Sequence, residues 1–258
     1  MTNQTLKTAI IQTAIYWKEK SANHAALEEK IWSVEDDVDL IILPEMFNTG
    51  FCPEDPAMGE HPNLTTFKWM LQMAQMKKCA IMGSYMVNDE GEVYNRMVLV
   101  DEEGHYSSYD KKHLFSFAEE HKQLQAGTLR PVFQLKGWRI FPAICYDLRF
   151  PVWLRNDCAY DLLVTVANWP EARVDAWKAL LKARAIENAA YVCGVNRVGK
   201  DGNNIAYNGH SAIFDFKGQR LNKWSEKEEI ITQTLDKTAM QQFREKFPVI
   251  NDRDEFSF

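Results

Sequence analysis

The feature that most constrains the fold is a set of short, almost continuous apolar runs that stop at turn residues or polar side chains. Two of them are "VDLIILP" at 38–44 and "YDLLVTVAN" at 160–168. Runs of this length without polar alternation are typical of strands covered on both faces. Amphipathic segments at 64–78 and 171–190 have the spacing of helices. Together, these segments predict an α/β protein in which helices cover buried sheets.

Hairpin signals interrupt this alternation in both halves of the chain. "NDEGE" at 88–92 joins two strand-like runs, and Lys136-Gly137 joins two more. This pattern favours a mixed sheet, or two sheets covered by helices, over a doubly wound parallel sheet. No linker rich in Gly, Pro or Ser divides the chain. We therefore predict a single domain over residues 1–247, followed by an extended tail at 248–258.

Composition excludes several classes of protein. Hydrophobic residues make up 46% of the chain, charged residues 26%, and the net charge is −6, so neither nucleic acid nor an anionic membrane is an expected partner. No apolar run approaches the roughly 18 residues of a membrane span. The five cysteines are widely spread, without C-x-x-C or zinc-ligand spacing. We expect a cytoplasmic protein without a metal centre.

Polar side chains that could carry chemistry follow three of the strand-like runs. Glu45 follows "DLIILP", Lys111 and Lys112 follow "YSSYD", and Cys145 follows "IFPAI". Each has an ordinary structural explanation: a loop carboxylate, exposed lysines, and a small buried thiol. Considered together, these residues also have a chemical explanation, because functional groups in α/β proteins gather at the edge where the strands end.

A thiol becomes nucleophilic when a base or a cation lies beside it. Glu45 can be that base, and a lysine ammonium can stabilise the oxyanion that forms when sulfur attacks a carbonyl. The sequence therefore predicts a nucleophile, a general base and an electrophilic stabiliser, none of which is a histidine.

The same segments resemble the nitrilase-like carbon–nitrogen hydrolases. The three motifs read "IILPEMFNTGF" (41–51), "YDKKHLF" (109–115) and "PAICYDLRFP" (142–151), and the resemblance covers about residues 6–235. It implies a four-layer α-β-β-α sandwich, hydrolysis of a carbon–nitrogen bond through a thioester, and no cofactor. Position by position, it makes Glu45 the base, Lys111 the conserved lysine and Cys145 the nucleophile.

The resemblance also implies further active-site groups. A second glutamate stands after the lysine motif; it is Glu119 or Glu120, and the spacing to Gly127 favours Glu120. The backbone N–H of Tyr146 is the expected second oxyanion donor. Relatives pair through helical layers and extended tails, so a homodimer or a higher homo-oligomer is expected, with the segment 248–258 as a candidate arm.

Arg149 is the main sequence signal for the substrate, since a guanidinium can bind a carboxylate through two hydrogen bonds. We expect it near the start of a short helix at 151–158. "CYDLRFP" and "HLFSFAEEH" resemble the ω-amidase branch, which acts on monoamides of 2-oxo-dicarboxylic acids such as 2-oxoglutaramate. Other pocket residues are expected to be Asn168, Trp169, Phe47, Phe115 and Phe117.

Several alternatives stay open at this point. Within the same family, a nitrilase, an N-carbamoyl amine hydrolase or an aliphatic amidase would carry the same three motifs. An inactive scaffold or a small-molecule sensor would keep the fold, but it would be expected to lose a member of the set. A thiol redox protein would leave Glu45 and Lys111 unexplained.

Overall fold

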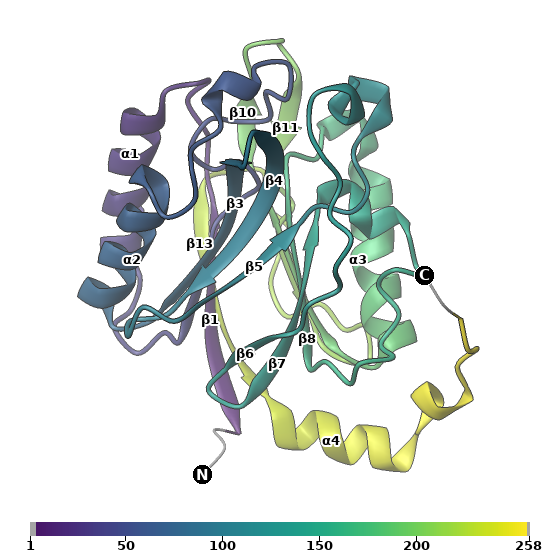
Figure 1. Ribbon diagram of the computed structural model, residues 1–258. Helices are drawn as coiled ribbons and strands as arrows, with labels where there is room; N and C mark the ends of the chain where they lie inside the picture. Colours follow the sequence, from purple (N-terminus) through teal and green to yellow (C-terminus); the bar gives the residue numbers. More distant parts are fainter. Residues whose placement is uncertain (1–3, 257–258) are drawn as a thin grey trace.

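The computed structural model describes residues 4–256 and contains two β-sheets that pack face to face (Figure 1). The first sheet has six strands in the order β13-β1-β2-β3-β4-β5. Its strands are β1 (Thr5–Gln12), β2 (Leu40–Ile42), β3 (Ala80–Asp89), β4 (Glu92–Val100), β5 (Tyr106–Asp110) and β13 (Glu229–Asp236). β1, β2 and β3 are parallel, whereas the β3–β4 and β4–β5 pairs are antiparallel, so the sheet is mixed.

The second sheet has five strands in the order β12-β9-β8-β7-β6. Its strands are β6 (Phe133–Leu135), β7 (Trp138–Ile144), β8 (Leu162–Ala167), β9 (Tyr191–Asn196) and β12 (Ala212–Phe214). β7, β8 and β9 are parallel, and an antiparallel strand lies at each edge. A small hairpin, β10 (Val198–Lys200) and β11 (Ala206–Asn208), follows β9; the sequence had not indicated β11.

Helices cover the outer faces of both sheets. α1 (Lys20–Ser33) and α2 (Thr65–Lys77) lie on the first sheet, and α3 (Val174–Asn188) lies on the second (Figure 1). α4 (Lys237–Lys246) follows β13 at the lower end of the view. The predicted four-layer α-β-β-α sandwich is confirmed. Within the described chain, no helix combines the length and apolarity that a membrane crossing requires.

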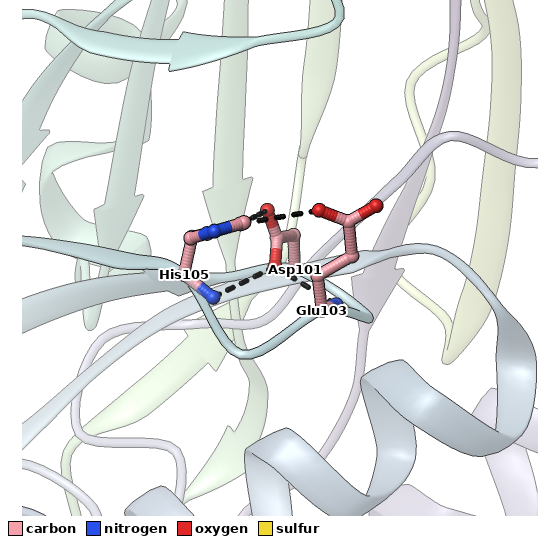
Figure 2. Close-up of side chains that lie close together, drawn as sticks. All are labelled: Asp101, Glu103 and His105. Carbon is pink, nitrogen blue, oxygen red and sulfur yellow. Dashed lines mark hydrogen bonds and ion pairs between the residues drawn. The ribbon is translucent and has the colours of Figure 1, made fainter.

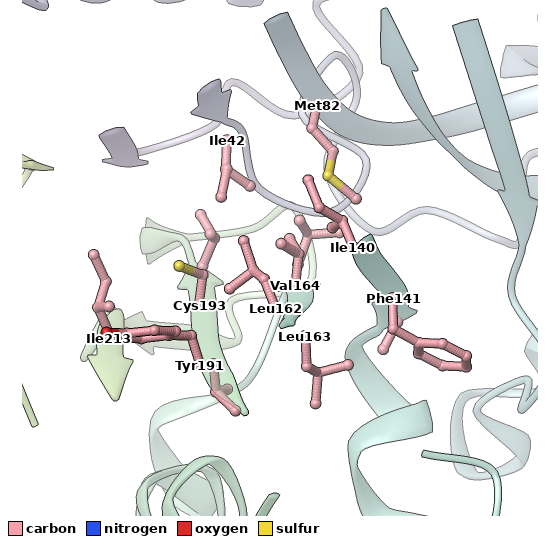
Figure 3. Close-up of a cluster of buried hydrophobic side chains, with 14 of the residues drawn as sticks. Ile42, Met82, Ile140, Phe141, Leu162, Leu163, Val164, Tyr191, Cys193 and Ile213 are labelled. Atoms are coloured by element: carbon pink, nitrogen blue, oxygen red, sulfur yellow. The ribbon is translucent and has the colours of Figure 1, made fainter. Parts of the chain in front are cut away.

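The centre of the molecule lies between the sheets. Ile42 and Met82 of the first sheet face Ile140 and Val164 of the second, and all four are fully buried (Figure 3). Neighbouring residues such as Ile41 point to the other face of the first sheet and pack under α1 and α2. Both faces of these strands are therefore covered, which explains why the sequence runs are apolar without alternation.

The predicted helix at 151–158 was wrong. The chain instead forms a single 3₁₀ turn, η4 (Cys145–Arg149), and then an irregular turn. Phe150 has φ −110° and ψ 89°, as expected for a residue held out of the helical region by the proline that follows it. Arg149 consequently ends a helical turn instead of preceding one.

The C-terminal segment also differs from the extended tail that was predicted. After α4 the chain makes a short 3₁₀ turn, η6 (Val249–Asp252), before the irregular residues that follow it. The last two residues of the predicted tail lie outside the described part. The role of residues 248–258 as a dimer arm stays a prediction.

Candidate active site

The predicted chemical residues follow strands whose carboxyl ends lie at one edge of the sandwich. β5 runs in the same direction as β2 and β3, because two antiparallel steps separate it from β3. Glu45 comes three residues after β2, and Lys111 directly follows β5. In the other sheet, Cys145 directly follows β7, and Asn168 directly follows the parallel strand β8. Facing sheets thus deliver these groups to one place.

Lys111 lies between two glutamates and is fully buried with both of them. Its Nζ is 2.9 Å from Glu45 Oε1 and 3.0 Å from Glu120 Oε2. Glu119, the other candidate, is exposed and pairs with Lys122 on the surface. Glu120 is therefore the glutamate that contacts the lysine, and its Oε2 also accepts a 2.6 Å bond from the backbone N–H of Phe115.

Glycine is required where the segment after Glu120 returns to the lysine. A Cβ at Gly127 would stand 2.1 Å from the carbonyl oxygen of Asp110, so no side chain fits there. The N–H of Gly127 donates to the carbonyl of Lys111. This close approach explains why a glycine stands at this position.

Asn95 joins the two glutamates and was missed in the sequence. It lies in β4, and its Nδ2 donates to Glu45 Oε1 at 2.9 Å and to Glu120 Oε1 at 3.4 Å. Its backbone carbonyl accepts from the N–H of Lys111. A polar residue within a strand-like run was a sequence signal for a functional side chain. Its glutamate partners become evident only when β4 is paired with β5.

Asn168 fixes Glu45 from the opposite sheet. The backbone N–H of Asn168 donates to Glu45 Oε2 at 2.7 Å, and its side-chain Nδ2 donates to the Glu45 carbonyl at 2.7 Å. With Lys111 and Asn95, these contacts hold the Glu45 carboxylate in one orientation. Asn168 was predicted as a substrate-binding residue, and the structure places it both on Glu45 and in the pocket wall.

Cys145 lies at the strand-to-turn junction in a strained conformation. Its φ is +45°, in the left-handed region that non-glycine residues seldom adopt. The thiol is partly buried, and Sγ is 3.9 Å from the carbonyl oxygen of Asn168. Burial raises the pKa of the Cys145 thiol well above its usual value; Glu45 and Glu120 raise it further, and Lys111 offsets part of the effect. A thiol in this environment needs a base to become nucleophilic.

The ion-pair cluster also changes the pKa values of its own members. Burial alone would lower the pKa of Lys111, but the charges of Glu120 and Glu45 outweigh it and raise this pKa. Burial raises the pKa of Glu120, opposed by Lys111 and supported by Glu45. The lysine therefore stays protonated as a fixed cation beside the thiol.

Asp147 anchors the turn that presents the cysteine. It is fully buried and accepts from the backbone N–H of Ile144 and the hydroxyl of Tyr109 at 2.9 and 2.8 Å. His113 donates its backbone N–H to the same carboxylate at 2.9 Å, and its Nδ1 lies 2.8 Å away. One carboxylate thus ties the lysine segment to the cysteine turn. The motif contained Asp147, but its partners were not evident from the sequence.

A pocket of about 330 Å³ opens over Cys145, a size suited to a small substrate. Its wall includes the remaining predicted residues: Lys111, Phe115, Phe117, Tyr146, Arg149, Asn168 and Trp169. Tyr146 is the second residue of η4, so the helical turn itself offers no acceptor for its backbone N–H. That group is free to serve as an oxyanion donor.

Phe47 does not belong to the pocket, and this prediction was wrong. It is fully buried on the outer face of the first sheet, where its ring packs against Trp69 and Tyr85 at centroid distances of 5.8 and 6.2 Å. Met46, with φ +44°, turns the chain before it, and the N–H of Phe47 then donates to the carbonyl of Ser84. The reversal directs the ring away from Cys145.

The β10–β11 hairpin forms a pocket wall that the sequence did not indicate. Asp201, Ile205 and Tyr207 line the cavity from this hairpin, and Arg173 lines it from η5 (Glu171–Arg173), which precedes α3. The Tyr207 hydroxyl donates to Asp201 Oδ2 at 2.8 Å. The weakly patterned loop "DGNNIAYNG" gave no sign that it would fold over the site.

A small group of possible metal ligands lies elsewhere. Asp101, Glu103 and His105 cluster in the turn between β4 and β5 (Figure 2). Asp101 Oδ1 accepts the backbone N–H groups of Glu103 and His105, so the carboxylate already stabilises the turn. This turn is at the opposite end of the β4–β5 hairpin from Asn95 and Lys111 and takes no part in the site.

Comparison with known proteins agrees with this geometry. The model of the family described as carbon-nitrogen hydrolase matches residues 7–245. Omega-amidase YafV of Escherichia coli (strain K12) is 41% identical over 252 residues, 97% of this chain and 98% of that protein. 2-Oxoglutaramate amidase of Bacillus subtilis (strain 168) is 33% identical over 247 residues, covering 94% and 90%.

Among solved structures, XC1258 from Xanthomonas campestris, a CN-hydrolase superfamily protein with an arsenic adduct in its active site, is 39% identical. Its TM-score is 0.96, and the match covers 99% of this chain and all of the other. The motifs, the two facing sheets and the near-complete family match lead to one conclusion. This chain belongs to the carbon–nitrogen hydrolase family.

Proposed function

We propose that the protein is an ω-amidase that releases ammonia from a monoamide of a 2-oxo-dicarboxylic acid such as 2-oxoglutaramate. The observation that carries this proposal is a thiol beside a lysine held between two buried glutamates, in a small pocket with an arginine at its mouth. The full-length similarity to YafV and to the B. subtilis amidase supports the same substrate class.

In the acylation step, Cys145 attacks the amide carbonyl and Glu45 accepts the thiol proton. The carbonyl becomes an oxyanion, which the Lys111 ammonium and the backbone N–H of Tyr146 stabilise. Loss of one such donor typically costs on the order of 10²–10³ in rate. The carbon–nitrogen bond then breaks, Glu45 returns its proton to the leaving nitrogen, and ammonia departs from a thioester.

In the deacylation step, Glu45 takes a proton from a water molecule that attacks the thioester carbonyl. The same two donors hold the second oxyanion, the carbon–sulfur bond breaks, and the thiolate regains the proton from Glu45. Because Asn95 and Asn168 hold the carboxylate in place, Glu45 can serve as base and acid in turn without reorientation.

Arg149 is the proposed carboxylate-binding residue. Its guanidinium lies 4.9 Å from the centre of the Trp169 ring, at the exposed side of the pocket. None of the described carboxylates pairs with it, so its hydrogen-bond donors are available to a ligand. A short acidic amide would place its carboxylate there and its amide carbon near Cys145.

Ammonia release from a substrate panel tests this function. The panel contains 2-oxoglutaramate, succinamate, an aliphatic nitrile and N-carbamoyl-β-alanine. We expect the highest kcat/KM for 2-oxoglutaramate. Preference for the nitrile or the carbamoyl compound would replace the proposal with nitrilase or N-carbamoyl amine hydrolase activity, and no turnover at all would favour an inactive scaffold or sensor.

For assembly, we propose a homodimer. Val152, in the turn after η4, is 53% exposed, and Ile186 on α3 is 49% exposed, so apolar side chains remain on the outer helical side of the second sheet. Light scattering on the purified protein should give twice the mass of one chain.

We also propose a cytoplasmic location, because five free cysteines suit a reducing compartment.

A further inference from the structure

The mouth of the pocket contains two arginines. Arg149 lies over the Trp169 ring, and the guanidinium of Arg173 is 5.4 Å from the centre of the Phe115 ring. Both residues line the cavity. In the described part of the chain, neither guanidinium has a carboxylate within ion-pair distance.

The acidic residues of the pocket wall are bonded to groups other than these two arginines. Glu54 pairs with Lys18 at 3.2 Å. The Asp201 carboxylate accepts the Tyr207 hydroxyl at 2.8 Å and the backbone N–H of Asn203 at 2.8 Å. At the inner end, Lys111 lies between its two glutamates. In the described part of the chain, Arg149 and Arg173 are thus the cations of the pocket wall that have no carboxylate partner.

Trp169 contacts both arginine residues, one through its side chain and the other through its backbone. Its ring lies beneath the guanidinium of Arg149, and its indole Nε1 donates to the backbone carbonyl of Arg173 at 2.8 Å. The backbone N–H of Trp169 donates in turn to Asn196 Oδ1. The guanidinium of Arg149 and the backbone of Arg173 thus contact one buried, hydrogen-bonded residue.

We infer that Arg173 is a second anion-binding residue, which works with Arg149 to select 2-oxo acids over 2-amino acids. This inference rests on the proposed function. A 2-oxo acid presents a carboxylate and a neighbouring carbonyl oxygen, all hydrogen-bond acceptors, whereas guanidinium groups only donate. The ammonium of a 2-amino acid would instead place a positive charge beside two others, which is strongly unfavourable.

The test compares four amides of similar length in the native enzyme and in Arg173→Gln. We expect KM to rise about 10-fold or more for 2-oxoglutaramate, less for succinamate, and less than about 2-fold for the neutral butanamide. The preference for 2-oxoglutaramate over glutamine should fall about 10-fold, with kcat on 2-oxoglutaramate nearly unchanged. Arg173→Lys, which keeps the charge, should recover part of the loss.

Lys68→Gln is the matched control, because it removes an exposed positive charge from α2, away from the pocket. The two possible failures are distinguishable. If the native enzyme does not hydrolyse 2-oxoglutaramate, the proposed function fails. If it does, but Arg173→Gln changes the kinetics on all four amides equally or on none of them, only the role of Arg173 is overturned.

Discussion

The inner end of the pocket and its mouth both carry cations, but they hold them in different ways. Lys111 is fully buried, and a glutamate pairs with it on either side. Arg149 and Arg173 lie on aromatic rings without a carboxylate partner in the described chain. A catalytic group benefits from being fixed before the substrate arrives, whereas a recognition group must leave its donors free.

The largest expected effect comes from removing the cation at the inner end of the pocket. Lys111→Met would leave Glu45 and Glu120 buried together without a cation. We expect kcat to fall on the order of 10³-fold and the free energy of unfolding to fall by roughly 3–5 kcal/mol. Steady-state kinetics and chemical denaturation measure both. Lys112→Met is the matched control, because Lys112 is the next residue and its ammonium lies over the Trp153 ring. A comparable loss of kcat in this variant would contradict the catalytic role of Lys111.

Glu120→Gln tests whether the second glutamate acts through its charge. The amide keeps the shape of the side chain but removes one of the two carboxylate charges beside Lys111, so we expect kcat to fall about 10²-fold with KM little changed. Glu119→Gln, on the neighbouring exposed residue, should stay within about 2-fold of the native rate. Equal behaviour of the two variants would contradict the placement of Glu120.

Arg149→Gln tests the mouth alone. We expect KM for acidic amides to rise about 10-fold, since one charged hydrogen-bonding group is lost, while kcat and the kinetics on a neutral amide stay close to native values. A uniform loss on acidic and neutral amides would mean that Arg149 supports the pocket structurally and does not bind the substrate carboxylate.

The smallest expected effect is a change of stability with pH, caused by two titratable residues near α1 and α2 that do not line the pocket. Burial lowers the pKa of His24, which stacks on Trp69. For Glu60, burial would raise the pKa, but hydrogen bonds from Thr66 and the ion pair with Lys20 lower it. In each case the unfolded chain binds a proton more readily than the native one, so stability is present at neutral pH and decreases as pH falls.

The loss from His24 begins as pH falls below its unfolded pKa of about 6.5; the loss from Glu60 comes at lower pH. Thermal unfolding at pH 7.5 and 5.5 should show a modest decrease in Tm. His24→Gln should reduce that decrease, whereas exposed His61→Gln should not. An unchanged pH dependence in His24→Gln would refute the role of this histidine.

The sequence allowed the inner end of the pocket to be predicted because Glu45, Lys111 and Cys145 each follow a strand-like run, and strand ends meet at one edge of the sandwich. Asn95 could not be predicted, because its role depends on the register of β4 against β5. Phe47 was misplaced because one residue with positive φ, Met46, reverses the chain. The wall formed by the β10–β11 hairpin comes from short strands and a polar loop, whose patterning is too weak to indicate where they fold.

The most direct test of the central claim is to trap the acyl group. Native enzyme turning over 2-oxoglutaramate is quenched in acid, digested and analysed by mass spectrometry, alongside Cys145→Ala. We predict an acyl adduct, equal to the substrate minus ammonia, on the peptide that contains Cys145, and neither adduct nor ammonia release from the variant. An adduct on another cysteine, or ammonia release by Cys145→Ala at the rate of the native enzyme, would contradict the account.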